Sequence, residues 1–145
     1  MVSEEIIEDM DTARDMLSKT DYSIVIIKKG DVITKKQGEG IRPILETIEE
    51  LGEDMKDTIV GDRILGKASA LLCVYSGVSG VYSPHATKTA IAILIRAGIP
   101  GQADKLISHI KNRSGDDVCP FEKMLANIDS AEEAYKVLKK KVIGI

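Results

Sequence analysis

The sequence is poor in aromatic residues and in cysteine. Of its 145 residues only 3% are aromatic, none is tryptophan, and two are cysteine. So few aromatic side chains are poor material for the stacking platform on which proteins bind single-stranded nucleic acid. Two cysteines are too few for the disulfide framework of a small secreted domain. Both classes of protein are therefore disfavoured.

The sequence also lacks an excess of positive charge and any long apolar segment. Lysine and arginine number 20 against 23 aspartates and glutamates, which gives a formal net charge of −3. This balance disfavours nucleic-acid binding through bulk electrostatics. No apolar run approaches the roughly 20 residues of a membrane-spanning helix, and the acidic N-terminus is unlike a secretory signal peptide. We therefore expect a cytoplasmic protein with neither a membrane nor a nucleic-acid partner.

What is present is typical of a globular α/β domain. Hydrophobic residues make up 43% of the chain, and its length is sufficient to bury a core. Apolar periodicity and turn residues predict helices at 4–18, 43–51, 62–75, 83–97, 120–127 and after 129, and strands at 22–28, 32–36, 78–82 and 106–110. Ser3 and Asp62 are expected to cap helices, and Asp129 with Glu132 to form a capping box. An initial helix and β-hairpin followed by alternating helices and strands predict one sheet with helices on both faces.

Three short motifs carry a resemblance to a known fold. They are GEGIRP at residues 38–43, GDRILGKASALL at 61–72 and NRSGDDVCPFE at 112–122. In their order and approximate spacing they resemble a small, functionally uncharacterised family of the cytidine-deaminase-like fold from archaea and bacteria. The resemblance covers most of the chain and implies a single cytidine-deaminase-like domain over residues 1–145, a three-layer α/β/α sandwich.

The zinc-binding motifs of working deaminases are missing. Those enzymes carry H-x-E at the start of the second helix and P-C-x-x-C at the start of the third, which supply three zinc ligands and a proton-shuttling glutamate. Here Lys67-Ala68-Ser69 and Pro84-His85-Ala86-Thr87-Lys88 occupy those places. Of the three zinc ligands only His85 remains, and a single ligand cannot form a zinc site. We therefore expect no metal, no other cofactor and no zinc-dependent deamination.

Cys119 and Glu122 form the first candidate catalytic pair. Cys119 directly precedes Pro120, a residue typical of the first helical position, so the cysteine takes the N-cap position. Backbone N–H groups and the helix dipole favour a nucleophilic thiolate there, and Glu122 is a candidate proton carrier. The alternative is a structural capping box in which sulfur replaces the usual hydroxyl.

Lys67 is the next candidate. It follows Gly66 inside the helix predicted from Asp62. A mid-helix glycine costs about 1 kcal/mol relative to alanine, so Gly66 indicates close packing or backbone approach to a ligand. Lys67 would then bind an anion or act as an uncharged amine, and the alternative is a surface lysine with its head group in water. Asp62 is a further candidate catalytic group, although a helix cap explains it more simply.

The turn around Arg42 has the ingredients of an anion site. It combines glycines, a helix N-terminus and a guanidinium group, although a plain strand-to-helix turn before Pro43 is the alternative. Asn112 and Arg113, just ahead of the loop that leads to Cys119, offer similar polar groups. The candidate ligand-binding residues are Gly38, Gly40, Arg42, Gly66, Asn112 and Arg113.

Two functions follow from these candidates. The first is a zinc-free deaminase-like domain that binds a small phosphate-bearing or nucleotide-like molecule. The second is a zinc-independent enzyme with Cys119 as nucleophile and Glu122 or Lys67 in acid–base or anion-binding roles. We expect the GEGIRP turn and the start of the Lys67 helix to face one shared pocket, since ligand crevices of open α/β sheets lie where helices begin. Whether the chain forms a homo-oligomer stays open.

Overall fold

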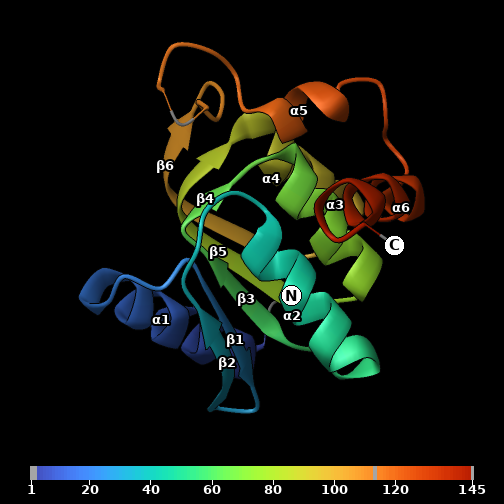
Figure 1. Cartoon of the computed structure of the whole chain (residues 1–145). Helices are drawn as coiled ribbons and strands as arrows, with labels where there is room; N and C mark the ends of the chain where they lie inside the picture. The colour runs from blue at the N-terminus through green and yellow to red at the C-terminus, as the bar shows by residue number, and fades with distance from the viewer. Residues whose placement is uncertain (1–2, 113, 145) are drawn as a thin grey trace.

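The computed structural model describes residues 3–112 and 114–144 (Figure 1). The helices are α1 (Glu4–Lys19), α2 (Arg42–Leu51), α3 (Lys67–Ser76), α4 (Lys88–Arg96), α5 (Pro120–Met124) and α6 (Ala131–Val142), with a 3₁₀ turn η1 (Gly52–Met55) after α2. The strands are β1 (Ile24–Lys28), β2 (Asp31–Lys36), β3 (Ile59–Asp62), β4 (Ile64–Leu65), β5 (Gly80–Thr87) and β6 (Gly101–Ile107). None of these helices is both long and apolar enough to span a membrane.

The strands form one mixed sheet in the order β2–β1–β3–β5–β6, and β4 continues β3 along the same edge of β5. β1 runs antiparallel to β2 and β3, whereas β3, β4 and β6 run parallel to β5. Parallel neighbours need crossover connections, which α3 and α4 supply. The carboxyl ends of β4 and β5 therefore lie at the edge of the sheet where α3 and α4 begin.

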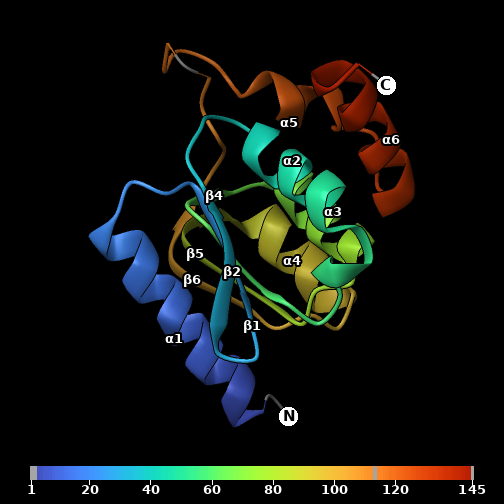
Figure 2. The same ribbon diagram turned by 60° about the horizontal axis from the view of Figure 1, so that its bottom comes forward.

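Helices cover both faces of this sheet (Figure 2). Of the described helices, α1 packs against one face, where its buried Met10, Ala13 and Leu17 share a core with Tyr82. Helices α2, α3, α4 and α6 cover the other face and enclose the larger core. The predicted α/β sandwich, a mixed sheet flanked by helices, is confirmed.

The N-terminal third follows its local sequence signals. The Ser3 hydroxyl accepts a hydrogen bond from the N–H of Ile6 at 3.3 Å and caps α1, as predicted. The predicted hairpin forms, with Lys29 and Gly30 in the positive-φ conformations of a tight turn. Helix α2 ends at Leu51, also as predicted, and Gly52 is its C-cap.

Strand β5 is longer than predicted, and it replaces the start of a predicted helix. The Ser83-Pro84 pair signals a helix start, yet the strand continues to Thr87, which caps α4. Neighbouring strands pair with β5 on both edges. Pro84, which has no N–H to donate, lies opposite the break between β3 and β4. Pairing along both edges thus overrides the local helix signal.

The prediction of a helix cap at Asp62 is wrong. Asp62 ends β3, and α3 begins only at Lys67 with Gly66 as its N-cap. Close packing of α1 explains Gly61, the residue before Asp62, because a Cβ at Gly61 would lie 3.0 Å from the Cβ of Ala13. The strands β3 and β4, which occupy most of residues 59–65, were not among the predicted elements.

The C-terminal elements are also displaced from their predicted bounds. Strand β6 spans Gly101–Ile107 rather than 106–110, and α5 ends at Met124 rather than 127. The Asp129 capping box is wrong, because the Ser130 hydroxyl caps α6 by accepting from the N–H of Glu133 at 3.2 Å.

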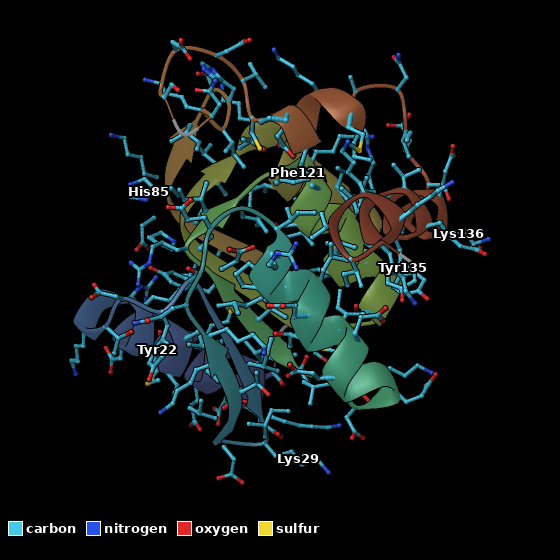
Figure 3. All side chains as sticks on the ribbon, viewed as in Figure 1. Tyr22, Lys29, His85, Phe121, Tyr135 and Lys136 are labelled. Atoms are coloured by element: carbon cyan, nitrogen blue, oxygen red, sulfur yellow. The ribbon has the colours of Figure 1, made fainter. Side chains whose placement is uncertain are left out.

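Helix α6 is held against α3 by an aromatic pair. The rings of Tyr75 and Tyr135 stack with their centroids 4.1 Å apart, and Tyr135 is labelled in Figure 3. The Tyr135 hydroxyl and the Lys139 ammonium both donate to the carboxylate of Glu49, at 2.8 and 2.7 Å. These contacts fix the C-terminal helix beside the helix that begins at Lys67.

Candidate functional site

The carboxylate of Glu122 lies against the N-terminus of α3. Its Oε1 accepts from the backbone N–H of Lys67 at 2.8 Å, and its Oε2 accepts from the N–H of Ala68 at 2.9 Å. The N-cap residue Gly66 has no side chain with which to accept these bonds. Glu122 therefore caps α3 from another helix, and its negative charge also suits the dipole of α3.

Gly66 is the residue that permits this approach. A Cβ at that position would lie 2.2 Å from Glu122 Oε1 and 2.3 Å from Ile110 Cδ1. Its φ of −114° is accessible to any residue, so space rather than backbone conformation explains the glycine. The close contact at Gly66 is thus with protein atoms, and its role toward a ligand stays a prediction.

The side chain of Lys67 joins α3 to the segment after α5. Its Nζ donates to Asp129 Oδ1 at 3.0 Å and to the carbonyl of Ala126 at 3.3 Å. Only 14% of the Lys67 side chain is exposed. The lysine is therefore paired at its head group and largely covered along its stem, unlike a freely solvated surface lysine.

A small open pocket lies beside the contact between Glu122 and α3. Its volume is about 160 Å³ and it is lined by Lys67, Thr87, Thr89, Ser108, His109, Ile110 and Glu122. The Thr87 hydroxyl accepts from the N–H of Ala90 at 3.1 Å, and Ser108 Oγ lies 2.9 Å from His109 Nδ1. The lining therefore offers hydroxyl groups, an imidazole, an ammonium group and one carboxylate.

Four polar residues of this pocket were not predicted as site residues. Thr87 ends β5, Thr89 lies in the first turn of α4, and Ser108 and His109 follow β6. They share a position at the carboxyl ends of parallel strands, where α/β sheets bind ligands. That signal was present in the sequence but needed the correct bounds of β5.

Asp62 is not one of the residues that line the pocket. Burial raises the pKa of its carboxyl group to about 7, while hydrogen bonds from the Ser69 hydroxyl and the Ile64 backbone act in the opposite direction. The residue keeps some accessible surface, but protein atoms surround the carboxyl group. Burial, and secondarily the charge of Asp62, raises the pKa of the Cys73 thiol well above its ordinary range. Cys73 is thus an inert core residue.

Cys119 takes the N-cap position of α5, as the sequence predicted, and it is half-buried. Its side chain makes no capping hydrogen bond, and Glu122 turns to α3 instead of back to Cys119. The capping-box alternative is therefore wrong. Cys119 does not line the pocket either. Its role as a nucleophile stays a prediction.

The GEGIRP turn lies against α5 rather than in the pocket. A Cβ at Gly40 would lie 3.5 Å from the ring of Phe121, which is labelled in Figure 3. The Arg42 guanidinium donates to the carbonyl of Val142 at 2.8 Å, and Arg42 does not line the pocket. Gly38 lies in the same turn with a φ of 142°. The structure therefore does not bring Arg42 and Lys67 into one pocket.

Asn112 is engaged within its own loop. Its Nδ2 donates to Asp116 Oδ1 at 3.0 Å, and its Oδ1 accepts from the N–H of Asp116 at 3.2 Å. Arg113 lies outside the described residues. The structure thus gives Asn112 a loop-stabilising contact, and its ligand-binding role stays a prediction.

The residues that the resemblance places at the zinc position do not fit a zinc ion. The Lys67 ammonium is a donor-only group already paired with Asp129. His85 is exposed on β5 (Figure 3). Within residues 3–112 and 114–144, no three His, Cys, Asp or Glu side chains come together as a metal site would require.

Solved structures of other proteins share this fold. The chain is similar to the crystal structure of a DUF1893 family protein (TM1506) from Thermotoga maritima, with a TM-score of 0.85 and 22% identity over 97% of this chain and 92% of that one. Two structures of Acinetobacter baumannii RibD have TM-scores of 0.50 and 0.51 at 16% and 17% identity over 69% and 68% of this chain. This chain spans about a third, 36% and 35%, of those RibD chains. At such identities the likeness shows the deaminase-like fold alone.

Comparison of the sequence with known families leads to one assignment. No curated protein matches the chain. Residues 12–142 match the family described as a domain of unknown function, DUF1893 (TM1506). That match covers most of the chain, including every residue of the pocket and of the contact between Glu122 and α3. The chain belongs to the DUF1893 family.

Proposed function

We propose that this protein is a single zinc-free, deaminase-like domain that binds a small phosphate-bearing ligand in the pocket beside Lys67. The observation that carries the proposal is the pocket's position. It lies where α3 and α4 begin, at the carboxyl ends of the parallel strands β4, β5 and β6. Ligands of open α/β sheets bind at this edge.

The chemistry of the pocket suits a phosphate group. The hydroxyls of Thr87, Thr89 and Ser108, with the imidazole of His109, supply hydrogen bonds to phosphate oxygens. The Lys67 ammonium supplies positive charge, and hydrogen bonds to ionised groups are about twice as strong as neutral ones. The Glu122 carboxylate opposes an anion, but both of its oxygens are already held by N–H groups of α3.

The volume of the pocket limits the size of the ligand. About 160 Å³ lies below the roughly 300–1,000 Å³ of pockets that enclose drug-sized molecules. A phosphate group with a short attachment fits this space, whereas a whole nucleotide does not. The base and sugar of a nucleotide-like ligand would therefore project from the open mouth of the pocket.

A zinc-independent enzyme that uses Cys119 has less support. The thiol is not among the groups that line the pocket, and α5 has only five residues with which to build a dipole. The Glu122 carboxylate, its proposed proton carrier, faces α3. We therefore place binding ahead of catalysis, with Lys67 as the principal anion-binding residue.

Isothermal titration with inorganic phosphate and with a small phosphomonoester tests the proposal. Lys67→Gln and Thr89→Val should each weaken binding, and Lys67→Gln by about tenfold because it removes a charged donor. Asp129→Asn is a matched variant, because it breaks the Lys67 ion pair but changes no pocket residue. Arg42→Gln should leave the affinity unchanged. Equal affinities for wild type and Lys67→Gln would refute the proposal.

A further inference from the structure

A second cavity, of about 280 Å³, lies on the α1 face of the sheet. The C-terminal half of α1, strands β5 and β6, and Arg63 between β3 and β4 enclose it. It shares no lining residue with the Lys67 pocket. Of the described helices, α1 is the one that covers this face (Figure 2), so the cavity is bordered by a single helix. Its volume approaches the lower end of the range for small-molecule sites, roughly 300 Å³.

One wall of this cavity is a fixed polar group centred on Asp104. The Tyr82 hydroxyl donates to Oδ2 of Asp104, and Arg14 Nη2 donates to Oδ1 at 3.1 Å. The Arg14 guanidinium also lies over the Tyr82 ring, 4.9 Å from its centroid. The hydrogen bond from Tyr82, followed by the contact with Arg14, holds the pKa of Asp104 below its usual range. Asp104 is thus charged and oriented, with lone pairs left for a further donor.

Arg63 supplies the opposite charge. Its Nε and Nη2 donate to the carbonyls of Leu17, Thr20 and Tyr22 at 2.7–2.9 Å, at the C-terminal end of α1. A helix C-terminus carries only about half an elementary negative charge, so the guanidinium is incompletely balanced. Within residues 3–112 and 114–144 it forms no ion pair, and its described hydrogen bonds leave Nη1 unused. Partly buried charges normally have a partner.

We propose that this cavity binds a small organic carboxylate that also carries a hydroxyl or ammonium group. The ligand carboxylate pairs with Nη1 of Arg63, because a guanidinium group matches the geometry of carboxylate and phosphate oxygens. The hydroxyl or ammonium donates to Asp104 at the other end of the cavity. Leu17 and Pro84 supply apolar surface for a short carbon skeleton.

The charges in the cavity also exclude other ligands. Two carboxylates, Asp15 and Asp104, and two guanidinium groups, Arg14 and Arg63, line the cavity, so the formal charges of its lining cancel. A ligand that carries one carboxylate and a donor group suits this balanced lining better than doubly charged inorganic phosphate does. A neutral or cationic molecule without a carboxylate leaves Arg63 without a counter-ion. The two sites thus differ in the chemical class they accept.

An NMR titration of the ¹⁵N-labelled full chain tests this inference. The ligands are glycine, lactate, acetate and ethanolamine, and binding is monitored through the amide chemical shifts. Glycine and lactate should shift the amide signals of residues 14–18, 82 and 104. Acetate, which has no hydroxyl or ammonium group, should bind about tenfold more weakly. Ethanolamine, which has no carboxylate, should cause no saturable shift at these residues.

Two variants locate the binding groups without replacing Arg63, which holds the end of α1. Asp104→Asn should weaken glycine binding about tenfold, and Tyr82→Phe should weaken it less, because it removes only a group that orients Asp104. Lys67→Gln in the other pocket should not change it. The inference is overturned if glycine and lactate cause no saturable shifts, if their shifts map to the Lys67 pocket, or if a folded Asp104→Asn binds glycine as wild type does.

Discussion

The carboxylate of Glu122 occupies the space that a side chain at Gly66 would fill. The position of a Cβ on Gly66 lies 2.2 Å from Glu122 Oε1. Glu122 can therefore approach α3 in this way only because residue 66 is glycine. This relationship joins two segments that are far apart in the sequence and fixes α5 over the start of α3. The pocket proposed to bind phosphate lies directly beside it.

Gly66→Ala should therefore destabilise the protein by about 1–3 kcal/mol, because the added methyl group displaces Glu122 and Ile110. Urea unfolding measures the change. In a Glu122→Ala background the same substitution should cost less, because one of the two obstructing side chains is gone. Strictly additive effects of the two substitutions would contradict a direct contact.

Glu122→Ala should reduce the free energy of unfolding by about 1–2 kcal/mol, the usual cost of losing a helix cap. Glu122→Gln should cost less, because an amide oxygen still accepts one N–H bond. Glu132→Ala is a suitable control, because among the described residues Glu132 forms an exposed ion pair with Lys136, and such pairs contribute little. If Glu122→Ala and Glu132→Ala unfold at the same urea concentration, the capping role of Glu122 is wrong.

Asp62 should make stability depend on pH. Its folded-state pKa of about 7 lies above the unfolded value of about 3.9, so the folded state binds more protons between these pH values. Its contribution to stability is therefore fully present below about pH 4 and is lost as the pH rises through about 7. Within that window the free energy of unfolding should fall by up to about 1.4 kcal/mol per pH unit.

Asp62→Asn should abolish this part of the pH dependence. The difference between wild type and variant isolates Asp62 from carboxyl groups such as Asp104, whose lowered pKa acts at more acidic pH and in the opposite direction. Urea unfolding of both proteins at about pH 5 and about pH 8 provides the comparison. Parallel pH profiles for wild type and Asp62→Asn would show that the carboxyl group of Asp62 is not perturbed.

The two cysteines should differ in alkylation. Cys73 is buried whereas Cys119 is half-exposed. In the folded state, the Cys119→Ser variant should therefore not react with an alkylating reagent, whereas the Cys73→Ser variant should react. The reaction rate tests the predicted nucleophile, because an activated thiol reacts faster than free cysteine near neutral pH. A rate equal to or below that of free cysteine would leave Cys119 without a catalytic role.

Elements with strong local signals could be predicted from the sequence. Ser3 caps α1, a β-hairpin follows this helix, and α2 ends at Leu51, all as expected. The middle of the chain could not be predicted this way. Asp62 and the Ser83-Pro84 pair carry local helix signals, but pairing between distant strands places both in the sheet.

The candidate site was predicted only in part, for a similar reason. The sequence points to Gly66 and Lys67 through a glycine inside a predicted helix, and to Glu122 separately, through its spacing from Cys119. Their mutual contact depends on how α5 folds back over α3, which no local pattern encodes. Thr89 and His109 could not be recognised as site residues, because the predicted helix at 83–97 and strand at 106–110 place them inside those elements. Their shared location follows from the true bounds of β5 and β6 and from the parallel order of these strands.

The most direct test of the central claim is an NMR titration of the ¹⁵N-labelled protein with inorganic phosphate. We expect saturable shifts of the amide signals of Lys67, Thr89, Ser108 and His109, because these residues surround the pocket. Signals of Arg42 and Asp104, which lie outside it, should not change. Saturable shifts centred on Arg42 or Asp104, or no saturable shift at all, would contradict a phosphate site beside Lys67.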